Sequence, residues 1–213
     1  MSRHMTRPTI ALAATLAVSA FAASAFAPAA VAQSASHDTS TVKAGTYSIE
    51  PTHTQVGFTL LHLGFSYYSG VFSNASGTLT LDPSKPAASS LSVTIPIDSV
   101  QTTSTKLDGE LKGADWFDAG QFADATFVST SVTPVGRDAA KVVGNFTLHG
   151  VTKPETLNVR FVGAGVNPLD KQYTVGFEAT GTIKRSAFGV TKYVPLVGDV
   201  VKLTIAGAFE LKS

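Results

Sequence analysis

Alternation of apolar and polar residues dominates the chain from about residue 45 onward, and this is the period of a β-strand with one buried and one wet face. The segment KVVGNFTLHG spans residues 141–150. In it, Val142, Phe146 and Leu148 are separated by even numbers of residues, so on a strand they point to the same face. The same alternation recurs at 91–97, 157–161, 173–179 and 203–211. About eight such strands, several separated by clusters of Gly, Asn, Asp and Pro, predict an antiparallel all-β fold.

One segment lacks this period. TSTKLDGELKGADWFD, residues 103–118, spaces Leu107 and Leu111 four apart. That spacing places both leucines on one face of a helix, so we expect a short helix here. Its charged residues are interpreted as a solvated helix face and not as a site.

A sheet of about eight antiparallel strands either packs as a sandwich or closes into a barrel. The strands are long for a sandwich, and roughly eight is the number that closes around side chains or one small ligand, so a barrel is favoured. Large rings are expected to point inward: Phe58, Phe146, Phe161, Phe177 and Phe209. They could fill the interior or line a cavity, and the pattern leaves both alternatives open.

The first residues have the features of a signal peptide. Arg3 and Arg7 precede an apolar, Ala-rich stretch at 10–27, and small residues follow up to Ala32. This order of a charged region, an apolar region and a small-x-small site predicts export with cleavage after Ala32, so that residues 1–32 are removed. A transmembrane anchor is less favoured because the stretch is poor in Leu and barely long enough to span ~30 Å of hydrocarbon.

The rest of the chain divides into two parts. QSASHDTSTVKA at 33–44 has no apolar period and is expected to be a disordered polar leader. The folded domain is expected at 45–212. The sequence contains no cysteine, which excludes thiol catalysis and thiolate metal sites and leaves an exported chain to be held together by its core.

Charge and motifs narrow the function further. The 16 Lys and Arg residues face 15 Asp and Glu, and removal of the two signal-peptide arginines leaves one acid in excess, which argues against nucleic-acid binding. The sequence has no H-E-x-x-H, no G-x-S-x-G and no P-loop. We therefore expect no catalytic residue, no metal and no cofactor.

HTQVGFTLLHLGFS, residues 53–66, contains two histidines in a mainly apolar run. His53 and His62 are an odd number of residues apart, so on one strand they point to opposite faces and cannot share a metal, unless a bulge at Gly57 or Gly64 changes the parity.

His62 has the parity of the apolar residues Val56, Phe58 and Leu60. It could be a core imidazole with a satisfied hydrogen bond or a polar contact for a ligand. His149, which precedes a glycine, is interpreted as a turn residue.

At this point the residues resemble a known family. GTYSIEPTHTQVGFTLLHLGFSYYSGVFSNASGTLTLDP, residues 45–83, looks like the opening of the YceI-like family of bacterial polyisoprenoid-binding proteins. Four later segments agree in order: DWFDAGQFADATFVS, GNFTLHGVTKPETLNV, KRSAFGV and VGDVVKLTI. The resemblance covers residues 45–212. Ala123 departs from it, because the family commonly has proline there, and this affects a strand entry.

The resemblance implies an extended lipocalin-like antiparallel β-barrel, exported to the periplasm or beyond. Its long apolar cavity would take a polyprenyl chain or another amphiphilic lipid, with quinone-like molecules in the class. An apolar chain gains ~0.8 kcal/mol per buried CH₂, so such binding needs no catalytic group. A carrier of this kind would contact a membrane or a membrane protein transiently, and a homodimer is left open.

Strand parity selects the residues expected to line the cavity: Val56, Phe58, Leu60, His62, Phe146, Leu148, Val159, Phe161, Val175 and Phe177. Two alternatives to a carrier are kept. An enzyme acting on a barrel-bound lipid would use His62 and Arg185 around the reacting centre, although an ion pair at a strand end or on the surface is the favoured interpretation of Arg185. A filled barrel would serve as a stress or interaction protein.

Overall fold

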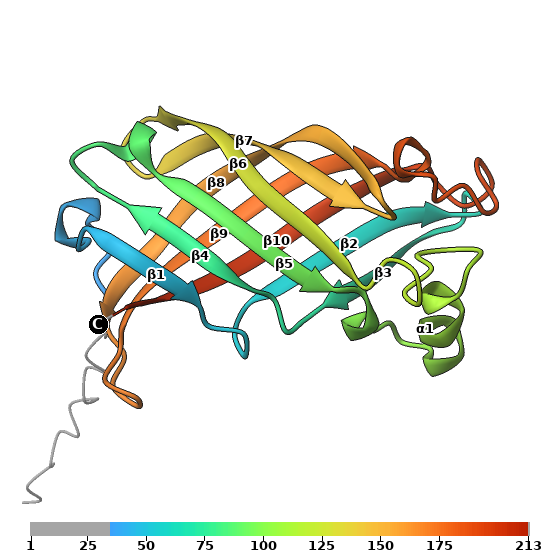
Figure 1. Ribbon diagram of the computed structural model, residues 1–213, viewed down its shortest axis with the longest axis horizontal. Coiled ribbons are helices and arrows are strands. Elements are labelled where there is room, and N and C mark those ends of the chain that lie inside the picture. Colours follow the sequence, from blue (N-terminus) through green and yellow to red (C-terminus); the bar gives the residue numbers. More distant parts are fainter. Residues whose placement is uncertain (1–34, 213) are drawn as a thin grey trace, which may run out of the picture. The chain divides into compact units, whose positions relative to one another are not determined.

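The alternating segments form an antiparallel sheet in the computed structural model, which describes residues 35–212 (Figure 1). The predicted signal peptide lies outside the described residues. The strands are β1 (Gly45–Ile49), β2 (Gln55–His62), β3 (Ser66–Phe72), β4 (Ser76–Leu81), β5 (Ser90–Pro96), β6 (Asp124–Val135), β7 (Ala139–Leu148), β8 (Val151–Val166), β9 (Tyr173–Lys184) and β10 (Val200–Leu211). The helices are η1 (Thr39–Thr41), η2 (Pro86–Ala88), η3 (Ile97–Ser99), α1 (Thr105–Lys112) and η4 (Arg185–Phe188).

Eight of these strands close into a barrel, as the sequence pattern predicted. They follow the order β1-β4-β5-β6-β7-β8-β9-β10, and β1 closes the ring by pairing with the end of β10. In this closing pair Tyr47 lies opposite Leu211 and Ile49 lies opposite Phe209. Closure leaves no free sheet edge at this part of the ring.

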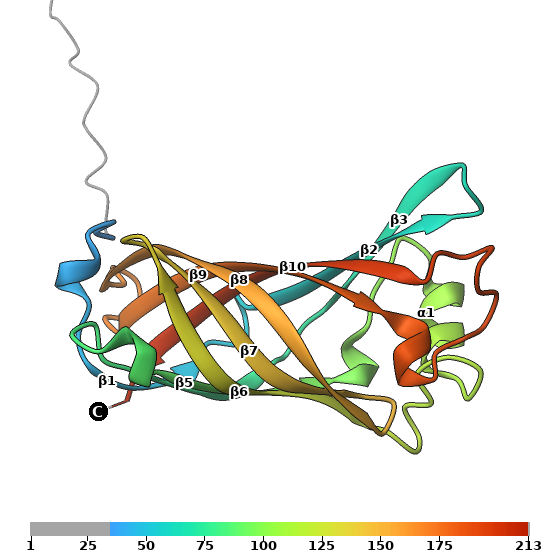
Figure 2. The same ribbon diagram turned by 90° about the horizontal axis from the view of Figure 1, so that it is seen from above.

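The β2–β3 hairpin is an addition to the ring. β2 pairs with the first half of β10, where Leu203 lies opposite Phe58, and β3 pairs with β2. Figure 2 shows the hairpin extending beyond the other strands at the end of the barrel that also carries α1. Residues 53–66, which were considered as one strand, therefore form strand β2 and the turn to β3, and the β2–β3 turn lies outside the barrel wall.

Helix α1 confirms the short helix expected within 103–118. The Ser104 side chain accepts a hydrogen bond from the backbone N–H of Leu107, which caps the first turn. Leu111 is buried, whereas Lys106 and Glu110 form an exposed i,i+4 ion pair, so the charged face is solvated as expected. No helix within residues 35–212 is long and apolar enough to cross a membrane.

The leader is ordered where the structure describes it, and the expected disordered spacer is wrong for residues 36–44. Ser36 and Ala164 exchange two backbone hydrogen bonds, of 2.8 and 2.9 Å. β7 stops pairing with β8 at Arg160, so the end of β8 has a free edge that Ser36 satisfies. Val42 is buried. Local composition could not reveal this pairing because its partner lies far along the chain.

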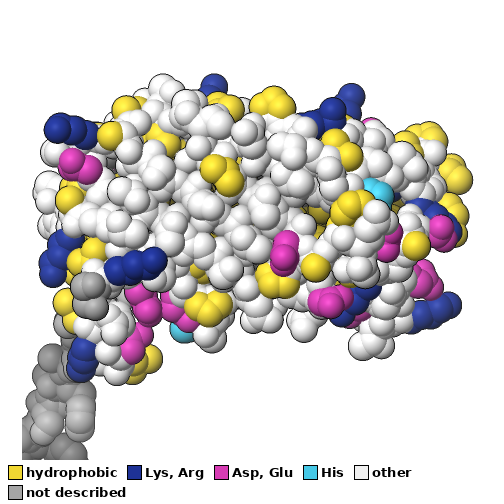
Figure 3. Space-filling view, viewed as in Figure 1, with side chains coloured by type: hydrophobic (Ala, Val, Ile, Leu, Met, Phe, Trp, Pro, Cys, Tyr) yellow, Lys and Arg dark blue, Asp and Glu magenta, His cyan; other side chains and the backbone are white. Residues whose placement is uncertain are grey.

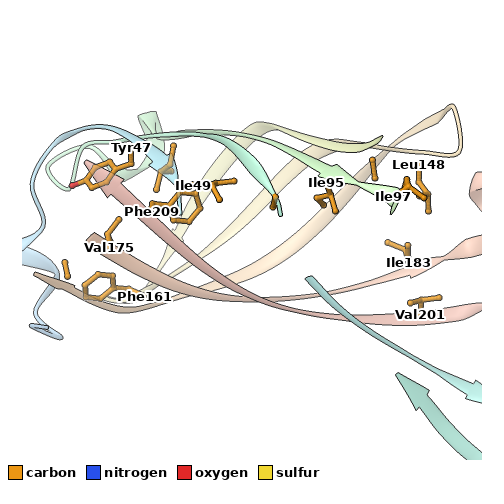
Figure 4. Packing of buried hydrophobic residues seen from close by; sticks show 14 of the residues in the cluster. Tyr47, Ile49, Ile95, Ile97, Leu148, Phe161, Val175, Ile183, Val201 and Phe209 are labelled. Atoms are coloured by element: carbon orange, nitrogen blue, oxygen red, sulfur yellow. The ribbon is translucent and has the colours of Figure 1, made fainter. Parts of the chain in front are cut away.

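The interior holds two groups of buried side chains (Figure 4). One group lies toward β1 and the end of β10: Tyr47, Ile49, Phe161, Val175 and Phe209. The other lies toward the opposite end of the barrel: Ile95, Ile97, Leu148, Ile183 and Val201. The part of the interior that these two groups of side chains leave unfilled is the space that the barrel offers to a ligand.

Candidate ligand cavity

The barrel is hollow along part of its interior. A cavity of about 290 Å³ is bounded by strands β4 to β10, together with parts of β1, β2 and η1. This volume is close to the lower end of ligand pockets, which run from roughly 300 to 1,000 Å³. Its strand walls are mostly apolar: Ile49, Val56, Leu79, Leu91, Val93, Ile95, Phe127, Val142, Leu157, Val159, Phe161, Phe177, Ala179, Ile205 and Phe209.

Aromatic rings form one side of this larger cavity. Phe177 meets Phe161 at a centroid distance of 5.9 Å and Phe209 at 6.0 Å, with interplanar angles of 65° and 73°. These edge-to-face contacts hold the three rings in place while one side of each faces the space. The inward phenylalanines thus line a cavity here and do not fill it.

A second, smaller cavity of about 80 Å³ lies nearer to α1. Its walls include Phe58, Leu60, Leu111, Trp116 and Leu203. Ile95 lines both cavities. The side chain of Ile95 therefore belongs to the partition between two apolar spaces inside one barrel.

Strand parity placed most of the predicted lining residues correctly around these spaces. Val56, Val159, Phe161 and Phe177 line the larger cavity. Phe58, Leu60 and Leu148 line the smaller one.

Phe146 and Val175 point inward but do not line either cavity. Phe146 packs edge to face against Phe188, with centroids 5.3 Å apart. Val175 is fully buried in the core at the β1 end. Parity gave the correct face for both residues, but it does not distinguish a packed position from one beside empty space.

His62 is not on an apolar inner face, and that expectation is wrong. Its side chain is exposed and lies 6.2 Å, ring to ring, from Tyr68 of β3. β2 pairs with β10 up to Thr59, and beyond that residue His62 pairs with Val197 of the loop that follows η4, where its side chain is not covered. His62 keeps the parity of Leu60 but faces solvent.

His53 and His149 have local roles. His53 precedes β2, is exposed, and places its Nδ1 2.6 Å from Oε2 of Glu50. His149 has a positive φ of 52° in the tight turn between β7 and β8, which confirms the expected turn position. In residues 35–212 no group of three His, Asp or Glu side chains is arranged to hold a metal ion.

Arg185 is neither a surface ion pair nor a free polar group in the cavity. Its side chain is buried, and its guanidinium donates hydrogen bonds of 2.8–3.0 Å to four backbone carbonyls, those of Val190, Lys192, Val197 and Gly198. The carbonyls belong to the segment that follows η4, so one arginine fixes the path of that segment. Burial lowers the pKa of Arg185, and the nearby Asp199 carboxylate opposes this effect.

Several cavity residues were missing from the sequence-based set. Leu91, Val93, Ile205 and Phe209 belong to strands whose alternation was recognised, so extending the parity argument would have found them. Pro83, Pro86, Pro134 and Arg137 lie in turns or at strand ends that also border the space. No periodic signal marks those positions, because their approach to the cavity depends on how the strands are joined.

Comparison with known proteins agrees with this geometry. Residues 47–209 match the sequence model of the YceI-like domain. The UPF0312 protein of Pseudomonas fluorescens is 41% identical over 155 residues, covering 70% of this chain and 78% of that protein.

Two solved structures have the same architecture. Burkholderia cenocepacia BcnA superposes with a TM-score of 0.68 at 27% identity, covering 75% of this chain and 98% of that one. A polyisoprenoid binding domain from Saccharophagus degradans superposes with a TM-score of 0.57 at 17% identity, covering 80% and 100%. At that identity the second likeness concerns the fold alone.

Proposed function

Because the chain belongs to the YceI-like family, we propose that it binds a polyisoprenoid or a similar amphiphilic lipid inside its barrel. The observation that carries this proposal is the apolar cavity of about 290 Å³ within the closed ring of strands. The description of the Saccharophagus degradans domain as polyisoprenoid binding supports the same ligand class. Quinone-like molecules with a prenyl tail belong to that class.

The energetics favour a long apolar ligand. Each buried CH₂ contributes ~0.8 kcal/mol, so several isoprene units can outweigh an association cost of ~4 to 15 kcal/mol without strong polar contacts. Val56, Val159, Phe161 and Phe177 would contact the chain in the larger cavity, and Phe58, Leu60 and Leu148 in the smaller one. A chain long enough to occupy both cavities would have to displace Ile95.

The protein would act as an exported carrier and not as an enzyme. The signal-peptide pattern of residues 1–32 supports transfer to the periplasm. Arg185 lines the smaller cavity, but its guanidinium already donates to four backbone carbonyls, and the side chain of His62 is exposed, so neither of the two groups considered for catalysis offers a free polar group to a lipid in the barrel. A carrier needs no metal or cofactor, but it needs transient contact with a membrane or membrane protein. A homodimer remains a further proposal.

The test is to purify the protein from its own periplasm and identify what it holds. Native mass spectrometry combined with organic extraction should find a prenyl lipid in stoichiometric amount, and the lipid should remain unaltered after long incubation. Empty protein that also takes up no prenyl lipid or fatty amide would contradict the proposal. Turnover of the lipid that disappears in His62→Ala would instead favour an enzyme.

A further inference from the structure

Exposed apolar side chains gather at the end of the barrel that carries α1 and the turn between β2 and β3. We define the end patch as seven residues: Leu61, Leu63, Phe65, Tyr67, Tyr193, Leu196 and Val200. Phe65 is 89% exposed, and Tyr67 and Leu196 are each 66% exposed. Figure 3 shows hydrophobic side chains collected at this end. We propose that the end patch docks on the surface of a lipid bilayer.

The end patch has two parts: one belongs to the β2–β3 hairpin, and the other belongs to the loop after η4 and the start of β10. Backbone hydrogen bonds join these two parts into one surface. The N–H of Leu63 donates to the carbonyl of Leu196 at 3.0 Å, and the N–H of Gly198 donates to the carbonyl of Leu61 at 2.7 Å. The four carbonyl contacts of Arg185 hold the same segment from within. The patch is therefore presented by a fixed framework, although its side chains are free to enter a lipid surface.

Part of the end patch lies on the outer face of β2 and β10, whose inner faces contribute to the smaller cavity. On β2, Leu60 lines the cavity and Leu61 belongs to the patch. On β10, Val201 lines the cavity and Val200 belongs to the patch. Trp116, also a cavity residue, meets Tyr193 of the patch with ring centroids 6.2 Å apart. The barrel wall, one strand thick at these pairs, separates the patch from the cavity, so docking would bring the membrane next to the cavity wall.

Charge and chemistry favour a bilayer over a protein partner. Lys202 lies 5.4 Å from the centre of the Tyr67 ring, and Lys192, which is also paired with the Asp115 carboxylate, lies 5.3 Å from the centre of the Tyr193 ring. Aromatic rings with lysines beside them are typical of the headgroup level of membranes, where the ring enters the interface and the ammonium meets lipid phosphates. Phe65 and Leu196 stand on turns, where a single projecting apolar side chain can insert into lipid.

This inference rests on the proposed function, because a lipid carrier has a reason to bind a membrane. Its test, however, does not require that the protein hold a lipid. The wild type, Phe65→Glu and Leu196→Glu are floated with vesicles of phosphatidylethanolamine and phosphatidylglycerol. Each variant should partition about tenfold less, because burial of one large apolar side chain supplies at least that factor. Leu169→Glu is the matched control, since Leu169 is 90% exposed at the turn between β8 and β9, at the opposite end.

Three results would overturn the inference. The first is a wild type that does not float, the second is loss of flotation in Leu169→Glu alone, and the third is a dimer in solution that Phe65→Glu converts to monomer. Lipid content of the purified proteins is measured in parallel and should not differ between variants. Empty protein that still floats through Phe65 would reject the carrier function and leave the docking surface standing.

Discussion

Arg185 donates a hydrogen bond of 2.8 Å from its guanidinium to the backbone carbonyl of Val197. The same guanidinium reaches the carbonyls of Val190, Lys192 and Gly198, so one buried side chain satisfies four acceptors in a segment without regular structure. A loop that carries unpaired carbonyls next to an apolar core is costly. Arg185 thus acts as an internal support for the segment that bears Tyr193 and Leu196.

Replacing Arg185 by Met should destabilise the protein without touching the larger cavity. We expect the free energy of unfolding to fall by about 2–4 kcal/mol, because carbonyls lose their donors and only some can be reached by water. Urea unfolding measures this change. Arg160→Met is the matched control, since Arg160 forms an exposed pair with Glu178 at 2.6 Å, and its loss should cost less than about 1 kcal/mol. Equal losses in the two variants would contradict the role assigned to Arg185.

Phe177→Asp should abolish uptake of a prenyl lipid. The ring stands between Phe161 and Phe209 in the wall of the larger cavity, and a carboxylate there would have to be desolvated by any apolar chain that enters. Native mass spectrometry after incubation with the lipid reports uptake. Phe177→Ala, which enlarges the space and adds no charge, should retain it.

The control for this prediction is Val128→Asp, because Val128 lies on β6 and is 47% exposed on the outer face. A folded Phe177→Asp variant that takes up as much lipid as Val128→Asp would show that the ligand does not enter the larger cavity.

Stability should fall at high pH because of Tyr47. Burial raises the pKa of this phenol to about 12 from the ordinary 10.0, with a smaller contribution from Tyr173. Between these two values the unfolded chain loses a proton that the folded chain keeps, so the free energy of unfolding decreases with rising pH, by up to about 2–3 kcal/mol. Urea unfolding at about pH 9 and about pH 11 measures the decrease.

Tyr47→Phe isolates this effect from other groups that titrate at high pH. The variant loses the hydrogen bond from the Tyr47 hydroxyl to the carbonyl of Lys43 and should start about 1 kcal/mol less stable. Its stability should then change less between the two pH values than that of the wild type. An equally steep decrease would mean that another group controls the alkaline loss.

Strand parity predicted the fold well because a strand with one buried face records that burial in its own sequence. Val175, Ala179 and Ile183 of β9 are buried in the alternating positions, and the same argument selected Phe161 on β8. Closure into a barrel followed from the number and length of such strands. The family motifs added the expectation of a hollow interior, to which the larger cavity corresponds.

What parity could not predict depends on contacts between distant segments. His62 has an inward parity, but its part of β2 pairs with Val197 of a distant loop and not with β10, and its side chain is exposed there. The burial of Arg185 depends on carbonyls that follow it by several residues and turn back over it. The leader is ordered because Ser36 meets Ala164, which lies far along the chain. None of these partners leaves a periodic signal.

The length of the bound lipid should depend on Ile95, which lines both cavities. Ile95→Ala removes part of the partition, so the variant should retain longer prenyl chains than the wild type, at a stability cost of about 2–4 kcal/mol for the lost packing. Ile95→Phe should strengthen the partition and favour shorter chains. Native mass spectrometry with a mixture of prenyl lipids of different lengths compares the three proteins. Val201→Ala is the control, because Val201 lines the smaller cavity and not the larger one. If Val201→Ala and Ile95→Ala shift the length distribution equally, added volume and not removal of the partition sets the selectivity, and the role given to Ile95 is wrong.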